Sequence, residues 1–256
     1  MKKTVKTIIL RTAGTNCDKE TAYAFQRAGS KVDLIHVNAL KKNKRVLEEY
    51  HVIAIPGGFT YGDDVASGRI LANELRSSLK RQIERFVSQG KLVVGICNGF
   101  QVLVKMGLLP NTGGAKSGNI EATLSLNDSG QFYDRWVYLK RDGGSEGKRQ
   151  VCVWTRNIPE VINIPIAHAE GKFIPRNGKV LDALKKNGQI VFRYSDKKGA
   201  LTGYPDNPNG SVDNIAGICD PSGRILGMMP HPERHITYLQ HPNWRRTDID
   251  DHMGIG

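Results

Sequence analysis

The strongest constraint on the fold is the alternation of short apolar runs with helical segments along the first hundred residues. The runs are rich in β-branched residues and occupy positions 5–10, 31–37, 52–56 and 91–96. Helical spacing lies between them over 17–29 and 69–89, where leucine, isoleucine or valine recurs every four positions from Leu71 to Val87. Strands that alternate with helices predict an α/β fold with a doubly wound, mostly parallel sheet and helices on both faces. Ligands of such sheets lie outside the carboxyl ends of the strands.

The chain changes character after Pro110. We predict shorter, more antiparallel strands within 120–140 and 149–154, an exposed loop over 141–149, and a loop over 195–214. A helix, a strand and a hairpin are expected at 179–188, at 189–194, and at 215–220 with 224–230. The segment after 230 begins helically and ends as a polar tail. The sequence therefore predicts one domain over 1–240, with a smaller antiparallel excursion, and a C-terminal tail over 241–256.

Composition excludes several classes of function. No segment has the length and apolar character of a transmembrane helix or a signal peptide, so the expected location is the cytoplasm. The four cysteines include no C-x-x-C pair, which argues against a zinc site or a disulfide scaffold. The net charge of +12 is spread along the chain without a nucleic-acid-binding motif, so we predict no nucleic acid and no membrane as partner.

The segment 93-VVGICNGFQVL-103 places a cysteine between two glycines where an apolar run ends and a helix over 98–107 begins. This is the cysteine form of the nucleophile elbow, in which glycines permit a sharp turn that exposes the nucleophile. Cys97 would then lie at a helix N-terminus, which favours a thiolate, and the backbone N–H of Asn98 could face a developing oxyanion. A buried structural cysteine is the alternative.

A nucleophilic thiol needs a base and a group that orients the base. His231 follows the apolar run 224–230, and Glu233 lies two residues later. We predict Cys97 as nucleophile, His231 as general base and acid, and Glu233 as the orienting carboxylate. The Gly-Gly pair after strand 52–56 offers Gly58 as a second oxyanion donor. His235 with His231 suggests a metal pair, but no further ligand completes it at the usual spacing, so no metal is predicted.

Several elements in their order along the chain resemble one enzyme family: RTAGTNCDKET, PGGFTYGDD, GICNGFQVL, PIAHAEGKF, YPDNPNGS, IAGIC and GMMPHPER. G-x-C-x-G with H-x-E is similar to class I, triad-type glutamine amidotransferases. GTNCD, FTYGDD and PNGS resemble the glutaminase subunits of phosphoribosylformylglycinamidine synthases. The resemblance places the family's triad on Cys97, His231 and Glu233, and it implies substrate contacts at Gln101, His168 and Glu170. Loop 141–149 and the segment after 240 have no counterpart in it.

The resemblance implies hydrolysis of L-glutamine and transfer of ammonia to an ATP-dependent synthetase in purine biosynthesis. The implied partners are a large synthetase subunit, which would hold ATP and Mg, and a small bridging subunit; no cofactor is implied for this chain. In agreement, neither 113–118 nor 146–149 matches the P-loop pattern. Two alternatives stay open at this point, a free-standing cysteine hydrolase or peptidase and an inactive subunit that serves assembly only.

Overall fold

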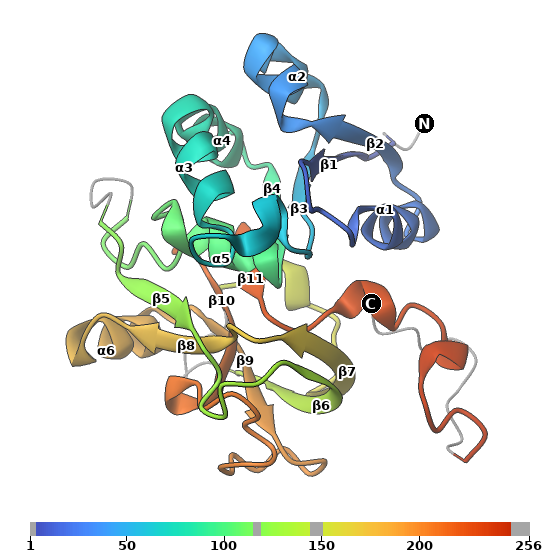
Figure 1. The fold of residues 1–256 in the computed structure, drawn as a ribbon, viewed down its shortest axis with the longest axis vertical. Coiled ribbons are helices and arrows are strands. Elements are labelled where there is room, and N and C mark those ends of the chain that lie inside the picture. Colours follow the sequence, from blue (N-terminus) through green and yellow to red (C-terminus); the bar gives the residue numbers. More distant parts are fainter. Residues whose placement is uncertain (1–3, 115–118, 144–150, 247–256) are drawn as a thin grey trace.

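The structure is a computed structural model that describes residues 4–114, 119–143 and 151–246. Within these residues, nine strands form one sheet (Figure 1). Their spatial order is β2 (Lys31–His36), β1 (Lys6–Arg11), β3 (Val52–Ile55), β4 (Leu92–Ile96), β11 (Ile225–Met228), β10 (Ile215–Cys219), β9 (Ile190–Ser195), β6 (Tyr133–Arg141) and β7 (Val161–His168).

The first five strands of this order run parallel and form the centre of the fold. The chain moves in one direction along the sheet from β1 to β2 and in the other from β3 to β4. Right-handed crossovers therefore place α1 (Asp18–Arg27) on one face and α3 (Arg69–Ser78) with α4 (Lys80–Ser88) on the other. The helix α5 (Asn98–Lys105) lies beside α3 over β3, β4 and β11 (Figure 1). Because helices cover both faces, β3 is buried along its whole length. The predicted α/β fold is confirmed.

The antiparallel strands β10, β9, β6 and β7 continue the same sheet. β10 and β11 form the predicted hairpin. A separate two-stranded antiparallel sheet contains β5 (Ala122–Ser125) and β8 (Lys172–Pro175), and α6 (Gly178–Asn187) follows it in the chain. The segment between β7 and β8 thus connects the two sheets.

The helix predicted over 69–89 is two helices, because the backbone of Leu79 leaves the helical region at φ −129°. The hydroxyls of Ser77 and Ser78 both donate to the Glu74 carbonyl, and such bonds compete with the helical ladder. The apolar residues spaced four apart nevertheless stay buried on both sides of the break, as Leu75, Leu79 and Ile83 show.

Other differences concern short elements. Val153–Thr155 forms a 3₁₀ turn where a strand was predicted. Residues 231–246, the described part of the segment after 230, contain the 3₁₀ turns Pro232–Arg234 and Tyr238–Gln240 and no α-helix. The strands β7 and β8 and the helix α2 (Val37–Lys42) were not predicted. Most of loop 141–149 and the end of the tail fall outside the described residues. Within the described residues no helix combines the length and apolar character that a membrane span requires.

Candidate active site

Two neighbouring parallel strands bring the predicted thiol and imidazole to one edge of the sheet. Ile96 at the end of β4 is in register with Met228 at the end of β11. Cys97 directly follows β4, and its N–H donates to the Met228 carbonyl at 2.8 Å. His231 follows β11, and its N–H donates to the carbonyl of Pro165 in β7 at 2.8 Å. The predicted meeting of Cys97 and His231 is therefore a consequence of strand register.

The backbone of Cys97 has the conformation of a nucleophile elbow, with φ 51° and ψ −106°. A non-glycine residue with positive φ costs about 1–3 kcal/mol and persists only where the surroundings impose it. At Cys97 the conformation is imposed by the close packing of α5 on the sheet, which Gly95 and Gly99 allow. A Cβ on Gly99 would lie 1.9 Å from the carbonyl oxygen of Ile55, and one on Gly95 would lie 2.5 Å from that of Gly99. Helix α5 consequently packs against β3 and β4 too closely for any side chain at these positions.

His231 and Glu233 form a buried pair, with 2.6 Å between Nδ1 and Oε1. Burial alone lowers the pKa of His231, but the negative charge of Glu233 and the nearby Cys97 sulfur outweigh it and raise this pKa well above its usual value. Since a carboxylate only accepts hydrogen bonds, Nδ1 carries a proton. Nε2 is buried and has no hydrogen-bond partner among the described residues. It is therefore free to exchange a proton with a reacting group.

Gly57 marks the point where three reactive side chains converge. A Cβ placed on it would lie 2.8 Å from His231 Cε1, 3.2 Å from Cys17 Sγ and 3.4 Å from Cys97 Cβ. The Gly57 carbonyl accepts from the N–H of Cys17, and Phe59 N–H donates to Gly14. These bonds fix the loop after β3 without using the N–H of Gly58.

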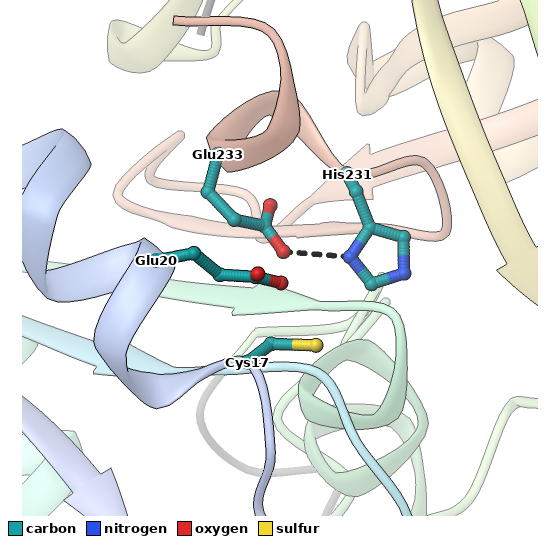
Figure 2. Close-up of side chains that lie close together, drawn as sticks. All are labelled: Cys17, Glu20, His231 and Glu233. Carbon is teal, nitrogen blue, oxygen red and sulfur yellow. Dashed lines mark hydrogen bonds and ion pairs between the residues drawn. The ribbon is translucent and has the colours of Figure 1, made fainter. Parts of the chain in front are cut away.

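Cys17 and Glu20 lie beside the His231–Glu233 pair (Figure 2). Neither they nor Arg234, which bonds both, are among the residues predicted from the sequence. Arg234 donates to Glu20 at 2.8 Å and to Cys17 Sγ at 3.2 Å. Burial raises the pKa of Cys17, so this thiol is protonated at neutral pH. The signal that could have located Cys17 is its position just past β1, at the same carboxyl edge as Cys97.

The Cys17, Glu20, His231 and Glu233 side chains are close enough together to ligate a metal ion, since one ligand atom of each lies within 4.8 Å of the others. However, the Arg234 guanidinium already bonds two of them and supplies positive charge there. We assign no metal to this cluster.

A pocket of about 210 Å³ opens beside Cys97. Five of the residues predicted from the sequence line it, namely Gly58, Cys97, Gln101, His168 and Glu170. Its wall opposite α5 is the turn that follows β7, and Cys97 Sγ lies 3.6 Å from the carbonyl oxygen of Ala167. Asn98 is the first residue of α5, where backbone N–H groups have no partner within the helix. The pocket is of a size for a small substrate.

The three residues predicted to contact the substrate are Gln101, His168 and Glu170. They differ in the hydrogen bonds that their side chains already make within the protein. Gln101 donates to the Glu170 carbonyl at 2.7 Å and accepts from the Asn98 side chain at 3.0 Å, so its amide is engaged within the protein. The Glu170 carboxylate accepts from the Ser67 N–H at 3.3 Å. His168 is buried, and its Nε2 has no hydrogen-bond partner in the described part of the chain. Their contacts with a substrate stay a prediction.

This sheet, with a buried His–Glu pair beside an elbow cysteine, is the architecture of a glutamine amidotransferase. Residues 4–255 match the family model of the CobB/CobQ-like glutamine amidotransferase domain, so the chain belongs to this family.

Two of its similar relatives are phosphoribosylformylglycinamidine synthase subunits PurQ. That of Dehalococcoides mccartyi is 47% identical, and the match covers 94% of this chain and 89% of the relative. That of Methanococcus maripaludis is 43% identical over 94% of this chain and 86% of the relative. Among solved structures, one chain of PurLQS from Thermotoga maritima has a TM-score of 0.71 and 28% identity, with 94% of both chains covered.

Proposed function

We propose that this chain is the glutaminase subunit of a phosphoribosylformylglycinamidine synthase. The observation that carries the proposal is that Cys97, which lines the pocket, lies beside the buried His231–Glu233 pair, because the two follow the neighbouring strands β4 and β11. Its chemistry is transfer of the side-chain acyl group of L-glutamine to a thiol and then to water.

In the first half-reaction, His231 Nε2 takes the proton of the Cys97 thiol, and Cys97 Sγ attacks the side-chain amide carbon of glutamine. The carbonyl π electrons move to oxygen, where the N–H groups of Gly58 and Asn98 would stabilise the charge. His231 gives its Nε2 proton to the amide nitrogen, the C–N bond breaks, and ammonia leaves a thioester on Cys97. In the second half, His231 removes a proton from water and hydroxide adds to the thioester carbon. The C–S bond then breaks, glutamate departs, and Cys97 regains its proton from His231. Glu233 keeps the imidazole oriented and stabilises its charged form.

The similarity to PurQ subunits, and to a chain of PurLQS, supports partners for the ammonia. We propose a large ATP-dependent synthetase subunit, which holds ATP and Mg, and a small bridging subunit. The synthetase would use the ammonia to convert formylglycinamide ribonucleotide to formylglycinamidine ribonucleotide. The assembly would operate in the cytoplasm.

The test is to assemble the chain with both partner subunits and compare glutamine with ammonium as nitrogen source. Cys97→Ala should abolish glutamine-dependent synthesis and retain ammonium-dependent synthesis, since only thioester formation needs the thiol. Cys219→Ala is the matched control, because Cys219 is a buried cysteine in β10 that does not line the pocket, and it should keep both activities.

A glutamine-analogue electrophile should label Cys97 and spare Cys17, Cys152 and Cys219, as read by mass spectrometry of the peptides. Unchanged glutamine-dependent synthesis in Cys97→Ala would refute the triad. Absence of glutaminase activity in the complete wild-type assembly would favour an inactive assembly subunit, whereas peptide hydrolysis without glutamine hydrolysis would favour a peptidase.

A further inference from the structure

The pocket wall formed by residues 167–170 is held by side chains that lie outside the pocket. The wall is the end of β7 with the turn that leads to β8, and it carries His168 and Glu170. Short turns keep a defined shape only where their backbone polar groups have partners. Gln101 in α5 bonds the Glu170 carbonyl, and the other partners come from two distant segments, around 127 and over 207–211. The second of these segments includes the PNGS motif.

Asn127 makes the largest number of these bonds. Its backbone N–H donates to the Ala169 carbonyl at 2.8 Å, and its Nδ2 donates to the His168 carbonyl at 2.9 Å. Its Oδ1 accepts from the Gly171 N–H at 3.1 Å. One side chain therefore binds both ends of the turn.

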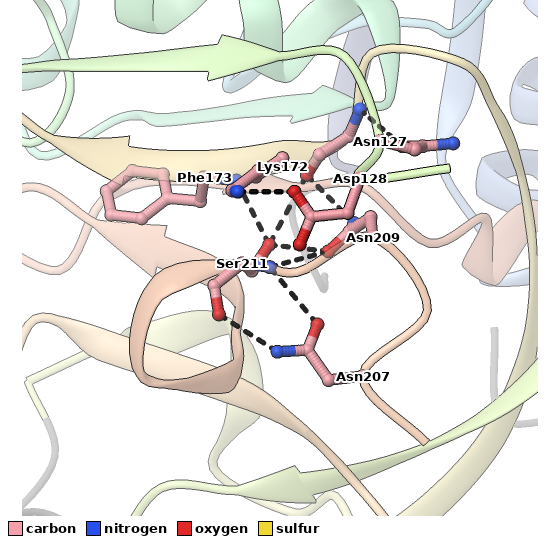
Figure 3. Close-up of polar contacts among 8 residues, drawn as sticks. Asn127, Asp128, Lys172, Phe173, Asn207, Asn209 and Ser211 are labelled. Atoms are coloured by element: carbon pink, nitrogen blue, oxygen red, sulfur yellow. Dashed lines mark hydrogen bonds and ion pairs between the residues drawn. The ribbon is translucent and has the colours of Figure 1, made fainter. Parts of the chain in front are cut away.

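Asn209 and Ser211 hold the far side of the turn (Figure 3). Asn209 Nδ2 donates to the Gly171 carbonyl at 2.9 Å, and Ser211 Oγ accepts from the Phe173 N–H at 3.0 Å. The two side chains also bond each other, at 2.7 Å between Ser211 Oγ and Asn209 Oδ1. Both are buried, so water does not compete with these bonds.

The same network fixes the tautomer of His168. Asn127 Nδ2 faces two carbonyl oxygens, of Gln131 and His168, while Oδ1 faces the Gly171 N–H, so the amide has one possible orientation. Oδ1 lies 3.1 Å from His168 Nδ1 and can only accept, so Nδ1 carries the proton.

The proton on Nδ1 leaves Nε2 of His168 as a bare acceptor. Burial, and then the nearby His231, lower the pKa of His168 to about 3, so the ring is neutral at physiological pH. Nε2 is buried and unpartnered among the described residues. An unpaired buried acceptor on a residue that lines a pocket is suited to an N–H donor of the ligand.

On the basis of the proposed function, we infer that Asn127, Asn209 and Ser211 are positioning residues for glutamine. They hold the 168–171 turn against the pocket and keep His168 in the tautomer whose Nε2 accepts a hydrogen bond from an N–H group of the substrate. The PNGS motif thereby acts on glutamine recognition without touching the ligand.

The test compares Asn127→Ala and Asn209→Ala with Asn163→Ala in the assembled complex. Asn163 is a matched control, because it lies on β7 ahead of the same turn and its side chain bonds Val137 and His241, away from the pocket. The first two variants should raise KM for glutamine at least tenfold, with a smaller change in kcat. Asn163→Ala should keep the wild-type KM.

The rates at which two reagents modify Cys97 distinguish a loss of glutamine positioning from a general disruption of the site. The glutamine analogue 6-diazo-5-oxo-L-norleucine should label Asn127→Ala at least tenfold more slowly than wild type, whereas iodoacetamide should react at the wild-type rate. An equal fall in both rates, or an unchanged KM, would overturn the inference. If Asn127→Ala proves unstable, Asn127→Asp takes its place in the test. It keeps the acceptor oxygen and the shape of the side chain, so its increase in KM for glutamine should be smaller than that of Asn127→Ala.

Nitrogen-15 NMR of the wild-type protein tests the tautomer independently of activity. The Nε2 shift of His168 should be that of an unprotonated nitrogen, and a protonated Nε2 would contradict the inference. If the wild-type complex fails to hydrolyse glutamine, the proposed function fails, whereas the NMR result still decides the tautomer.

Discussion

At the residue scale, the site combines one strained residue with one buried ion pair. Cys97 is held at positive φ by the close packing of α5, and His231 is held by Glu233 and by Pro165. Both features hold the Cys97 and His231 side chains of the proposed triad in place before substrate arrives. Such preorganisation reduces the entropy lost on reaching a transition state.

The proposed roles of His231 and Glu233 predict that substitutions at the two residues lower kcat to different extents. His231→Ala removes the proton carrier, so kcat for glutamine hydrolysis should fall by about 10⁴-fold or more. Glu233→Gln keeps a hydrogen-bond acceptor beside Nδ1 but loses the charge, so its loss should be at least about tenfold smaller. Steady-state kinetics in the assembled complex checks this, and equal losses would mean that Glu233 does more than orient the imidazole.

The raised pKa of His231 predicts a specific pH dependence of stability. In the unfolded chain this pKa is about 6.5. Above that pH the folded protein keeps a proton that the unfolded chain releases, so the free energy of unfolding falls as pH rises, by up to about 1.4 kcal/mol per pH unit. Glu233→Gln removes the charge that raises this pKa. The stability advantage of wild type over Glu233→Gln should therefore shrink between pH 6.5 and 8.5.

Urea unfolding at several pH values, followed by circular dichroism, measures that advantage. An advantage that stays constant over this interval would show that the charged imidazole does not contribute to stability.

At the scale of elements, the contact of α5 with β3 and β4 depends on glycine. We predict that Gly99→Ala lowers the free energy of unfolding by more than about 3 kcal/mol, because its Cβ would meet a backbone oxygen that cannot move alone. Gly178→Ala is the control, since it replaces a helical glycine in α6 with open space around it. Its stability should change by less than about 0.5 kcal/mol or rise slightly.

Denaturant titration of both glycine variants measures the two effects. Similar stabilities for Gly99→Ala and Gly178→Ala would mean that α5 can move away from the sheet without loss.

At the scale of the whole molecule, the pocket joins the two halves of the sheet. The parallel half supplies Cys97 and the loop with Gly58, and the antiparallel half supplies the turn after β7. A glutaminase subunit that ran constantly would waste glutamine, so a partner is expected to complete the oxyanion site by moving the Gly58 loop. We predict that kcat for glutamine hydrolysis by the isolated chain rises at least roughly tenfold when the synthetase and its nucleotide are added.

The control in this assay is Cys97→Ala, for which the synthetase and its nucleotide should not increase the rate of glutamine hydrolysis. Equal rates for the isolated chain and the mixture would instead identify a free-standing glutaminase.

The sequence by itself determined the parallel half of the fold and the identity of the residues in the proposed triad. Apolar runs, helical spacing and G-x-C-x-G are local signals, and local signals fix local structure. The break at Leu79 is not predicted because the apolar spacing continues through it. The two serine hydroxyls that donate to the Glu74 carbonyl just before the break leave that spacing unchanged.

Only the tertiary structure decided the surroundings of the site. Cys17 and Glu20 reach the His231–Glu233 pair from the opposite end of the chain, and Asn127 and Asn209 reach one turn from segments far apart in the sequence. Such contacts depend on the order and register of strands, which no short stretch of sequence encodes. For this reason the residues of the proposed triad could be named from the sequence, whereas the network that holds the pocket could not.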